Sequence, residues 1–498
     1  MSRTDHGIAT IDWYFFPLMS GRSFTMDDQL AFARLSGDFG PVHIDALYAR
    51  RTLYGHPLVH GVHIVLALIE DWIAADMVAF PFHGLSAQVM KPLFPGDAAT
   101  FAVTSDASSC TLTCLLGRAP ICKVVLSDPG DLPPHEVAAV APAASWPEIP
   151  AAPEPAQMAS WSGTILPICD EALALKLFPK LCRSLGPGRL ALILGLTRMV
   201  GMQCPGRESL LAGFDIALAS PPGADAVHCQ TTEVHAGLAH VQMRVMGGAM
   251  AGTVSSFIRP AIDATIPPIP AAARPRAGEF AGRRALIVGG SRGLGRMTAL
   301  LLAAGGADIA VTYRVGCVDC AELVAHIRAT GGQAQALQFD VADGRGLDAV
   351  FRENFSEPPS AAWVPTEVYY FATPQISPSR SGGFDRGLFQ RYLAIYVEGF
   401  LDLITRLRAA SRTPLAVYYP STAFLDQPNR KFIEYVAAKA AGEEVCRILG
   451  AGPGMRVVVE RLPRLPTDQT ASLLPQDSEE PFAVLLQSCR AMADRLGD

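Results

Sequence analysis

The chain has 498 residues and a formal net charge of −6; half of its residues are hydrophobic and 18% are charged. This length indicates about three domains of ~100–200 residues each. Basic residues are scattered rather than gathered in a stripe, which argues against a nucleic-acid-binding protein. The longest apolar stretch, Leu190–Met199, is interrupted by Arg198 and is shorter than the ~20 residues that cross a membrane, so we expect no membrane partner.

The N-terminal sequence MSRTDHGIATIDWYFF lacks a basic segment followed by an apolar stretch, so we expect no signal peptide. The eleven cysteines are irregularly spaced. Cys317 and Cys320 form a C-x-x-C pair, but no second pair or histidine follows at an interval typical of zinc sites. We therefore expect reduced thiols, a cytoplasmic protein and no metal site.

Two proline- and alanine-rich segments divide the chain. Residues 131–155 and 260–277 show no sustained helical or strand period. Proline removes a backbone donor and stiffens the chain, so both segments suit exposed connections. They separate three predicted units, residues 1–130, 156–262 and 278–498.

The first two units have a similar order of features. Each contains an apolar helical stretch, Val59–Ala75 in the first unit and Leu190–Gly201 in the second. Strand-like alternation follows, at residues 99–104 in the first unit and at residues 240–245 and 252–258 in the second. A helix followed by strands, used twice, predicts a duplicated α+β unit packed as a pseudo-dimer.

The most informative run of the first unit is SGDFGPVHID at residues 36–45, which places Asp38 and His43 five residues apart in a loop. A carboxylate and an imidazole on one face can act as acid and base in the reversible hydration of an α,β-unsaturated thioester. Gly61 opens the apolar helix, and its N–H could donate to the thioester oxygen as enolate charge develops. On spacing alone, Asp38 as a turn residue and His43 as a structural histidine remain the alternative.

Three ordered blocks resemble the MaoC-like dehydratases, the R-specific enoyl-thioester hydratases. The family pattern S-G-D-x-N-P-x-H-x-D corresponds to residues 36–45, and His60-Gly61 and KPLFPGD at residues 91–97 follow it. The resemblance implies a hot-dog fold, Asp38 and His43 as the catalytic dyad and Gly61 as the oxyanion donor.

Other residues of these blocks have structural roles in the same resemblance. His60 would orient the loop, and Asp45 and Asp97 would satisfy turn amides. One residue differs from the family pattern, because Gly40 replaces an asparagine whose side chain braces the loop. Errors near ~1 Å in such a loop can cost ~100-fold in rate.

The second unit contains no comparable Asp–His loop. His235 and His240 lie in a strand-like stretch, and we interpret both as core or surface histidines. By resemblance to double hot-dog proteins, this degenerate unit would supply part of an acyl tunnel and the pseudo-dimer interface.

Strands and helices alternate in the third unit. Ala285–Val288, Asp308–Thr312 and Ala336–Phe339 are predicted strands, and Arg296–Ala304 is a predicted helix after the first of them. This alternation predicts βαβ units and a Rossmann-type, doubly wound parallel sheet. The glycines after the first strand would let the backbone approach a pyrophosphate at the helix N-terminus.

The end of the second strand favours NADPH over NADH. Arg314 stands there in place of a carboxylate, and with Arg292 it could pair with a 2′-phosphate; two solvated surface arginines are the alternative. The predicted cofactor contacts are Gly289, Ser291, Arg292, Gly293, Leu294, Gly295, Arg314, Asp340, Val341, Ala372, Tyr435 and Lys439.

Tyr435 and Lys439 form a Y-x-x-x-K motif on a predicted helix. A spacing of four places both side chains on one helix face, where the ammonium can lower the pKa of the phenol. Ser421 and Thr422 precede this tyrosine by fourteen and thirteen residues and could hold a substrate carbonyl oxygen.

Residues 283–470 together resemble the short-chain dehydrogenase/reductase family, close to the 3-oxoacyl carrier-protein reductases. The resemblance implies Thr422 as the counterpart of the catalytic serine, with Ser421 as the alternative. It also implies that residues 463–468 lie near the nicotinamide, and that the chain forms a homodimer through the helix that carries Tyr435.

Three features differ from the reductase pattern. The usual N-N-A-G appears as Tyr370–Thr373, and Tyr396 replaces the asparagine that supports the proton relay. Only twenty-eight residues follow Thr470, too few for the usual substrate lid and last strand.

Three hypotheses follow. The first is a bifunctional enzyme of fatty-acid- or polyketide-like synthesis, which makes a (3R)-hydroxyacyl thioester with NADPH and then removes water from it. The acyl group would be carried on CoA or on an acyl carrier protein. The second hypothesis keeps the dehydratase alone, with a nucleotide-binding module that does not catalyse. The third is a catalytically silent acyl-binding scaffold, for which Gly40 is the only support in the dehydratase motif.

Overall fold

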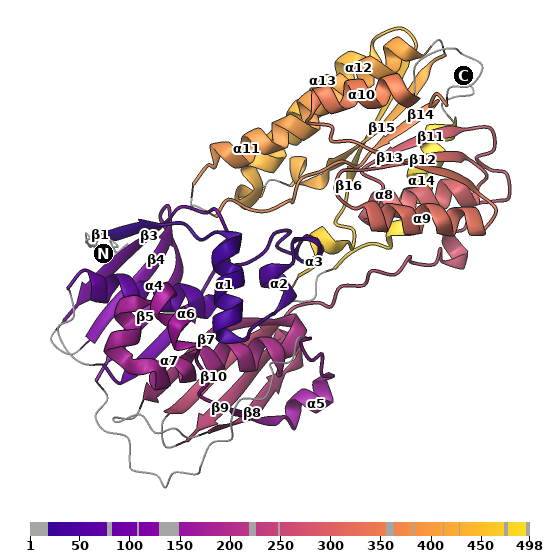
Figure 1. Cartoon of the computed structure of the whole chain (residues 1–498). Helices are drawn as coiled ribbons and strands as arrows, with labels where there is room; N and C mark the ends of the chain where they lie inside the picture. The colour runs from indigo at the N-terminus through magenta and orange to yellow at the C-terminus, as the bar shows by residue number, and fades with distance from the viewer. Residues whose placement is uncertain are drawn as a thin grey trace, which may run out of the picture. The chain divides into compact units, whose positions relative to one another are not determined.

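The computed structural model describes residues 18–76, 82–106, 109–128, 149–218, 226–247, 250–354, 363–380, 383–411, 413–427, 429–472 and 477–494 (Figure 1). These residues divide into two compact units. One contains the described chain up to Asp45 together with Pro57–Arg259, and the other contains Ala46–His56 and the chain from Pro260 onward. Most of the first predicted linker, residues 131–148, lies outside the described residues.

Antiparallel strands form the sheet of the first unit. Their bounds are β1 (Leu18–Arg22), β2 (Gly84–Val89), β3 (Ala99–Ser105), β4 (Ser109–Leu116), β5 (Ala119–Ser127), β6 (Ser162–Ile165), β7 (Ser209–Leu218), β8 (Val227–His235), β9 (His240–Met246) and β10 (Met250–Ile258). The ten strands follow the order β1-β3-β4-β5-β2-β7-β10-β9-β8-β6. Five strands from each side of the predicted linker therefore form one continuous sheet.

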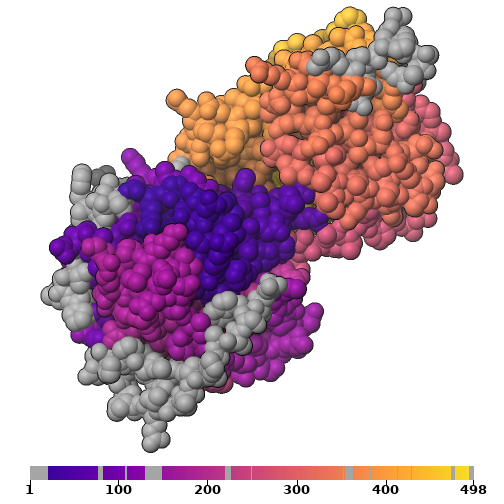
Figure 2. Space-filling view, in the orientation of Figure 1, coloured from indigo at the N-terminus to yellow at the C-terminus, as the bar shows by residue number. Residues whose placement is uncertain are grey.

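The two halves of this sheet meet where β2 pairs with β7, with Leu85 opposite Ile216. Figure 2 shows the indigo first half and the magenta second half side by side within this unit. Because β2 and β7 are paired along their backbones, the halves share hydrogen bonds as well as a core.

Helices cover one face of the sheet (Figure 1). Their bounds are α1 (Met26–Ser36), α2 (Pro41–Ile44), α4 (Gly61–Ala74), α5 (Pro155–Ala159), α6 (Glu171–Leu177) and α7 (Pro179–Met202). The apolar helix α4 packs against β4 and β5, and α7 packs against β7 and β10. These two central helices also contact each other, which explains why both are apolar on most sides.

Helix α7 bends at Gly186, whose φ of 77° is left-handed, and Pro187 begins its second part. The carboxylate of Glu70, near the end of α4, accepts hydrogen bonds from the N–H groups of Lys180 (3.0 Å) and Leu181 (2.7 Å). First-turn N–H groups have no partner within their own helix. Glu70 therefore completes the start of α7.

Glu70→Ala is expected to lower the free energy of unfolding by about 1–3 kcal/mol, because it leaves these first-turn amides without their acceptor. Glu70→Gln keeps one carbonyl oxygen and should lose less. Urea unfolding of both variants measures the difference. Equal stability of Glu70→Ala and the parent would contradict this role.

The second unit contains a six-stranded parallel sheet in the order β13-β12-β11-β14-β15-β16. The strands are β11 (Arg284–Val288), β12 (Asp308–Tyr313), β13 (Gln333–Gln338), β14 (Glu367–Tyr370), β15 (Leu415–Thr422) and β16 (Met455–Leu462). The strand order reverses between β11 and β14, which makes this a Rossmann-type sheet, as the sequence predicts.

Helices cover both faces of the parallel sheet. Their bounds are α8 (Gly293–Ala304), α9 (Cys317–Ala329), α10 (Gly344–Asn354), α11 (Arg386–Leu393), α12 (Phe400–Ala410), α13 (Ile433–Gly450) and α14 (Pro481–Asp494), and the short α3 (Ala46–Ala49) belongs to the same unit. One buried cluster joins α8, α9 and α14 to the sheet, and another joins α10, α12 and α13. Within the described residues, β16 is the last strand of the sheet.

None of the helices in the described ranges is long and apolar enough to cross a membrane.

Candidate functional sites

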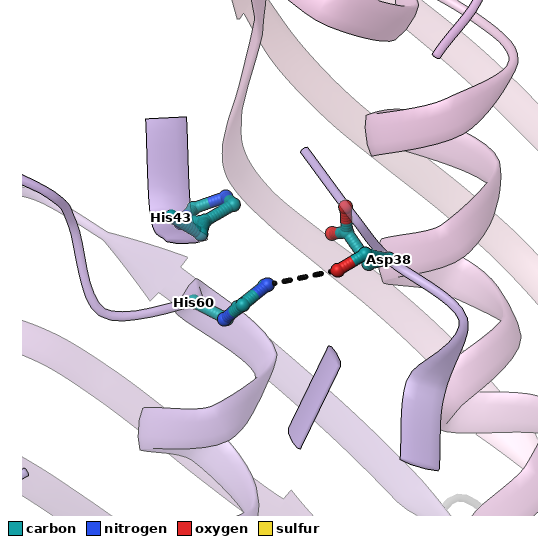
Figure 3. Close-up of side chains that lie close together, drawn as sticks. All are labelled: Asp38, His43 and His60. Carbon is teal, nitrogen blue, oxygen red and sulfur yellow. Dashed lines mark hydrogen bonds between the residues drawn. The ribbon is translucent and has the colours of Figure 1, made fainter. Parts of the chain in front are cut away.

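The Asp38 loop begins at the end of α1. Gly37 caps this helix in a left-handed conformation with φ of 74°, and its N–H donates to the carbonyl oxygen of Ala33. Pro41 then starts α2, which carries His43 toward Asp38 (Figure 3). The glycine and the proline therefore set the two turns between the carboxylate and the imidazole.

Asp38 is buried and its carboxylate is held at both oxygens. Oδ1 accepts a hydrogen bond from the N–H of Gly40 at 3.0 Å, and Oδ2 accepts one from Thr197 Oγ1 at 2.6 Å. The carboxylate lies within 4.8 Å of a ring nitrogen of His43 and of His60. Asp38, His43 and His60 together could hold a divalent metal ion. A carboxylate that is fixed by hydrogen bonds from Gly40 and Thr197 and lies beside an imidazole also suits acid–base chemistry.

His43 lies with Nδ1 3.0 Å from the carbonyl oxygen of Leu58. A carbonyl oxygen can only accept, so we assign the ring proton to Nδ1, which leaves Nε2 able to accept a proton. Burial lowers the pKa of His43 below its usual 6.5, and the nearby Asp38 carboxylate offsets part of this effect. The imidazole is therefore neutral at pH 7.

His60 is fully buried and stacks on His43, with ring centroids 3.9 Å apart. Its Nδ1 lies 3.0 Å from Gln29 Oε1 on α1. Its Nε2 lies 3.2 Å from the main-chain oxygen of Asp38, a contact drawn as a dashed line in Figure 3. Burial, with His43 nearby, lowers the pKa of His60 well below its usual value. His60 thus joins α1, the loop and α4, and we assign it a structural role.

Gly61 is the first residue of α4, where the N–H groups have no intrahelical acceptor. A Cβ atom on Gly61 would lie 3.1 Å from Val89 Cγ2 and 3.3 Å from Leu211 Cδ2. The side chains of β2 and β7 therefore approach the backbone closely here.

Asp97 has a turn role, because its Oδ2 accepts from the N–H of Phe94 at 2.8 Å.

Sequence reasoning missed the contribution of α7 to this site. Besides the bond from Thr197 to Asp38, Arg198 donates from Nη1 to the carbonyl oxygen of Ser36 at 3.3 Å and from Nη2 to that of Leu166 at 2.8 Å. Burial lowers the pKa of Arg198 to about 10. The available signal was a Thr-Arg pair inside an otherwise apolar helical stretch.

The lowered pKa of His43 predicts the pH dependence of hydration. If the neutral imidazole of His43 serves as the base of the hydration that the sequence predicts, its lowered pKa places the acidic decline of kcat/KM at a lower pH than the 6.5 of an ordinary histidine. Rates of crotonyl-thioester hydration on both sides of pH 6.5 measure the profile. An acidic limb centred at or above pH 6.5 would show that His43 is not held neutral.

The glycine-rich turn after β11 is closely packed. Gly289 has a φ of 74°, and a Cβ atom there would lie 2.8 Å from the nitrogen of Ala372. A Cβ atom on Gly295 would lie 2.6 Å from the carbonyl oxygen of Gly289. Only glycine therefore fits at Gly289 and at Gly295. The backbone from Ser291 through Leu294 leads into the start of α8, where free N–H groups can bind a pyrophosphate.

The two arginines proposed for the 2′-phosphate each have an acidic neighbour. Arg292 Nη1 donates to Asp468 Oδ2 at 3.2 Å. Arg314 lies 3.6 Å from Asp340, and its side chain is 71% exposed. An exposed pair of this kind contributes about 0–1 kcal/mol, so Arg314 can exchange Asp340 for a phosphate at little cost. Val341 follows Asp340 beyond the end of β13 and is buried.

Tyr435 and Lys439 lie on α13, and both are buried. Burial raises the pKa of Tyr435 to about 12, and a hydrogen bond with the Thr422 side chain lowers it. Ser421 Oγ donates instead to Glu443 at 2.6 Å. The hydroxyl of Thr422 therefore bonds to Tyr435, whereas that of Ser421 is directed to Glu443.

Lys439 lies in an aromatic environment. Its Nζ donates to the carbonyl oxygen of Pro420 at 2.6 Å and lies 4.0 Å from the ring centre of Tyr396. Burial lowers the pKa of Lys439 to about 7. The hydroxyl of Tyr396 bonds to Thr373, so the ring face, and not the hydroxyl, meets the amine.

Comparison with known proteins finds relatives for both parts of the chain. The (R)-specific enoyl-CoA hydratase of Aeromonas caviae is 31% identical over 84 residues, which are 16% of this chain and 62% of the hydratase. The 3-oxoacyl-[acyl-carrier-protein] reductase of Synechocystis sp. is 41% identical over 68 residues, 14% of this chain and 28% of the reductase. An uncharacterized oxidoreductase of Escherichia coli is 45% identical over 67 residues, 14% of this chain and 27% of that protein.

The chain thus spans about a quarter of the length of these two oxidoreductases and less than two thirds of the hydratase. Among solved structures, FolM alternative dihydrofolate reductase 1 from Brucella canis, complexed with NADP, is 19% identical with a TM-score of 0.37. The match covers 44% of this chain and 91% of that chain.

Two family models match separate parts of the sequence. The model described as "MaoC like domain" matches residues 18–109, which include the Asp38 loop and Gly61. The model described as "short chain dehydrogenase" matches residues 283–357, which include the glycine-rich turn and Arg314. The chain therefore carries a MaoC-like domain at its N-terminus and a short-chain dehydrogenase domain at its C-terminus.

Proposed function

We propose that the chain is a bifunctional enzyme that reduces a 3-oxoacyl thioester to a (3R)-hydroxyacyl thioester and then removes water from that product. The observation that carries the proposal is the buried Asp38 carboxylate within 4.8 Å of a His43 ring nitrogen, in a MaoC-like domain that shares its chain with a short-chain dehydrogenase domain. The two reactions are consecutive, so one chain would keep the intermediate near its second site.

Dehydration needs a proton to move from the α-carbon to the leaving β-hydroxyl. Nε2 of the neutral His43 would take the α-proton, while the N–H of Gly61 donates to the thioester oxygen as charge develops there. Asp38 would accept a hydrogen bond from the β-hydroxyl and hold it on the same face. The proton on His43 then passes to the departing hydroxyl, the carbon–oxygen bond breaks and water leaves.

The second site fits a nicotinamide dinucleotide, because the turn that contains Gly289 and Gly295 leaves room only for backbone at the start of α8. NADPH, when bound, supplies the hydride. Tyr435 would give its phenolic proton to the carbonyl oxygen, and Thr422 would orient that oxygen. Arg314 supports NADPH over NADH, since its exposed side chain can turn from Asp340 to a 2′-phosphate. Arg292 would have to give up its bonds to the Arg50 carbonyl oxygen and to Asp468 to join it.

The remaining parts of the proposal concern assembly and substrate. We infer that the ten-stranded sheet is a double hot-dog whose second half, at residues 156–262, is degenerate because its sequence has no Asp–His loop comparable to that of Asp38 and His43. The acyl group would be carried on CoA or on an acyl carrier protein, as the names of the hydratase and reductase relatives suggest. We propose a cytoplasmic homodimer that pairs through α13.

A second candidate function is a dehydratase with a nucleotide-binding domain that does not catalyse. Lys439 favours it, because its amine is bound to Pro420 and covered by the ring of Tyr396, where reductases of the family have an asparagine. In this arrangement the amine would have to leave its carbonyl partner before it could assist Tyr435.

Two assays on the purified full chain test the proposal. The first follows the loss of enoyl absorbance as a crotonyl thioester is hydrated, and the second follows NADPH oxidation with an acetoacetyl thioester. Activity in both supports the bifunctional enzyme. Hydration without NADPH oxidation selects the second candidate, and inactivity in both assays, on CoA and carrier-protein thioesters alike, leaves the silent acyl-binding scaffold.

A further inference from the structure

Residue 40 of the Asp38 loop is a glycine, so it offers no side chain to hold the Asp38 carboxylate. A Cβ atom on Gly40 would lie 3.1 Å from Asp38 Oδ1 and 3.3 Å from His43 Cδ2, which is tighter than most contacts of this kind. A larger side chain at residue 40 would therefore press on both members of the dyad. Within the loop, the carboxylate is held only by the N–H of Gly40, which reaches one of its two oxygens.

The other oxygen is held from the second half of the sheet. Thr197 on α7 donates to Asp38 Oδ2 at 2.6 Å, a length typical of a hydroxyl bound to a carboxylate, and this threonine is only 4% exposed. The two residues are 159 positions apart in the chain. A short, buried hydrogen bond of this kind fixes the rotation of the carboxylate.

Helix α7 follows the loop closely around this bond. A Cβ atom on Gly201, one turn after Thr197, would lie 2.2 Å from Asp38 Oδ1. The N–H of Phe39 donates to the sulfur of Met202 at 3.2 Å, and Arg198 donates to the carbonyl oxygen of Ser36. Ser36, Asp38 and Phe39 thus each contact a side chain or a glycine of α7.

We propose that Thr197 is a positioning residue for the dehydratase dyad, and that the second half, although it has no dyad of its own, is required for turnover because it carries this hydroxyl. This inference rests on the proposed dehydratase function. Thr197 acts through Asp38: it holds Oδ2 while the N–H of Gly40 holds Oδ1, so the carboxylate keeps one orientation toward His43.

The test compares Thr197→Val, which keeps the shape and removes the hydroxyl, with Thr197→Ser, which keeps the hydroxyl. We expect Thr197→Val to lower kcat for crotonyl-thioester hydration about 10- to 100-fold with KM changed less than 3-fold, because a misplaced catalytic group costs rate rather than binding. Thr197→Ser should retain most of the rate. Thr231→Val, which removes a hydroxyl beside Cys204 in the same half, is the matched control and should match the parent.

An unchanged kcat in Thr197→Val overturns the proposal, and so does an equal loss in Thr197→Ser, which would point to packing alone. NADPH oxidation by each variant shows whether the unit with the parallel sheet, which carries Tyr435, remains intact. A double-mutant cycle of Thr197→Val and Asp38→Ala, measured by urea unfolding, tests the bond without turnover. If the parent hydrates no thioester, the proposed function fails, and zero coupling in the cycle separately rejects the bond between Thr197 and Asp38.

Discussion

Asp38→Asn is expected to lower the rate of crotonyl-thioester hydration by about 10²–10⁴-fold, the usual contribution of one positioned acid–base group. The change should leave the fold intact. An amide oxygen can still accept from the N–H of Gly40, and the amide nitrogen can donate to the Thr197 hydroxyl, which can turn to accept. The loss would therefore report on the carboxylate rather than on its packing.

The assay is the disappearance of the enoyl absorbance, with urea unfolding as the test of folding. NADPH oxidation with an acetoacetyl thioester is an internal control, because Asp38 lies in the MaoC-like domain and should not affect that reaction. Hydration at the parental rate in Asp38→Asn would remove Asp38 from the mechanism, and the water-eliminating site would have to be sought elsewhere.

Tyr435→Phe is expected to lower NADPH oxidation with an acetoacetyl thioester by about 10²–10⁴-fold, because the phenol would supply the proton to the carbonyl oxygen. Phenylalanine fits the same buried space, where the hydroxyl otherwise meets Thr422. Binding of NADPH, followed by its fluorescence, should persist, since the glycine turn and α8 are unchanged.

Hydration by Tyr435→Phe should equal that of the parent, so each variant tests one reaction and controls for the other. Reduction at the parental rate in Tyr435→Phe would exclude this phenol as the proton donor. A parent that binds NADPH but does not oxidise it would instead favour the nucleotide-binding module, with Lys439 retained at Pro420 as the physical reason.

Local sequence patterns predicted much of the fold. The apolar stretch at Val59–Ala75 forms α4, and the predicted strands at 285–288 and 308–312 coincide with β11 and β12 to within one residue at each end. Such segments are determined by the period of their own side chains and by the glycines that end them. The Asp38 loop is also local, since five residues and two turns bring the carboxylate near the imidazole.

The rest depends on contacts between distant parts of the chain. Thr197 meets Asp38 only because β2 pairs with β7 and brings α7 beside the loop. The direction of the Ser421 hydroxyl on β15 depends on Glu443, which lies on α13. Nor does any local pattern explain why Ala46–His56 groups with the second unit rather than with the helices on either side of it. Side-chain periodicity reports burial but not the identity of the neighbour.

The pairing of β2 with β7 also has an evolutionary consequence. In an assembly of identical subunits, every substitution appears twice, so a residue adapted to support a neighbour's loop must also remain compatible with its own. Joined in one polypeptide, the two copies can specialise. If the two halves are the duplicated copies proposed above, the second half can do without an acid and base of its own while its Thr197 and Gly201, through a hydroxyl and a missing side chain, serve the loop of the first half.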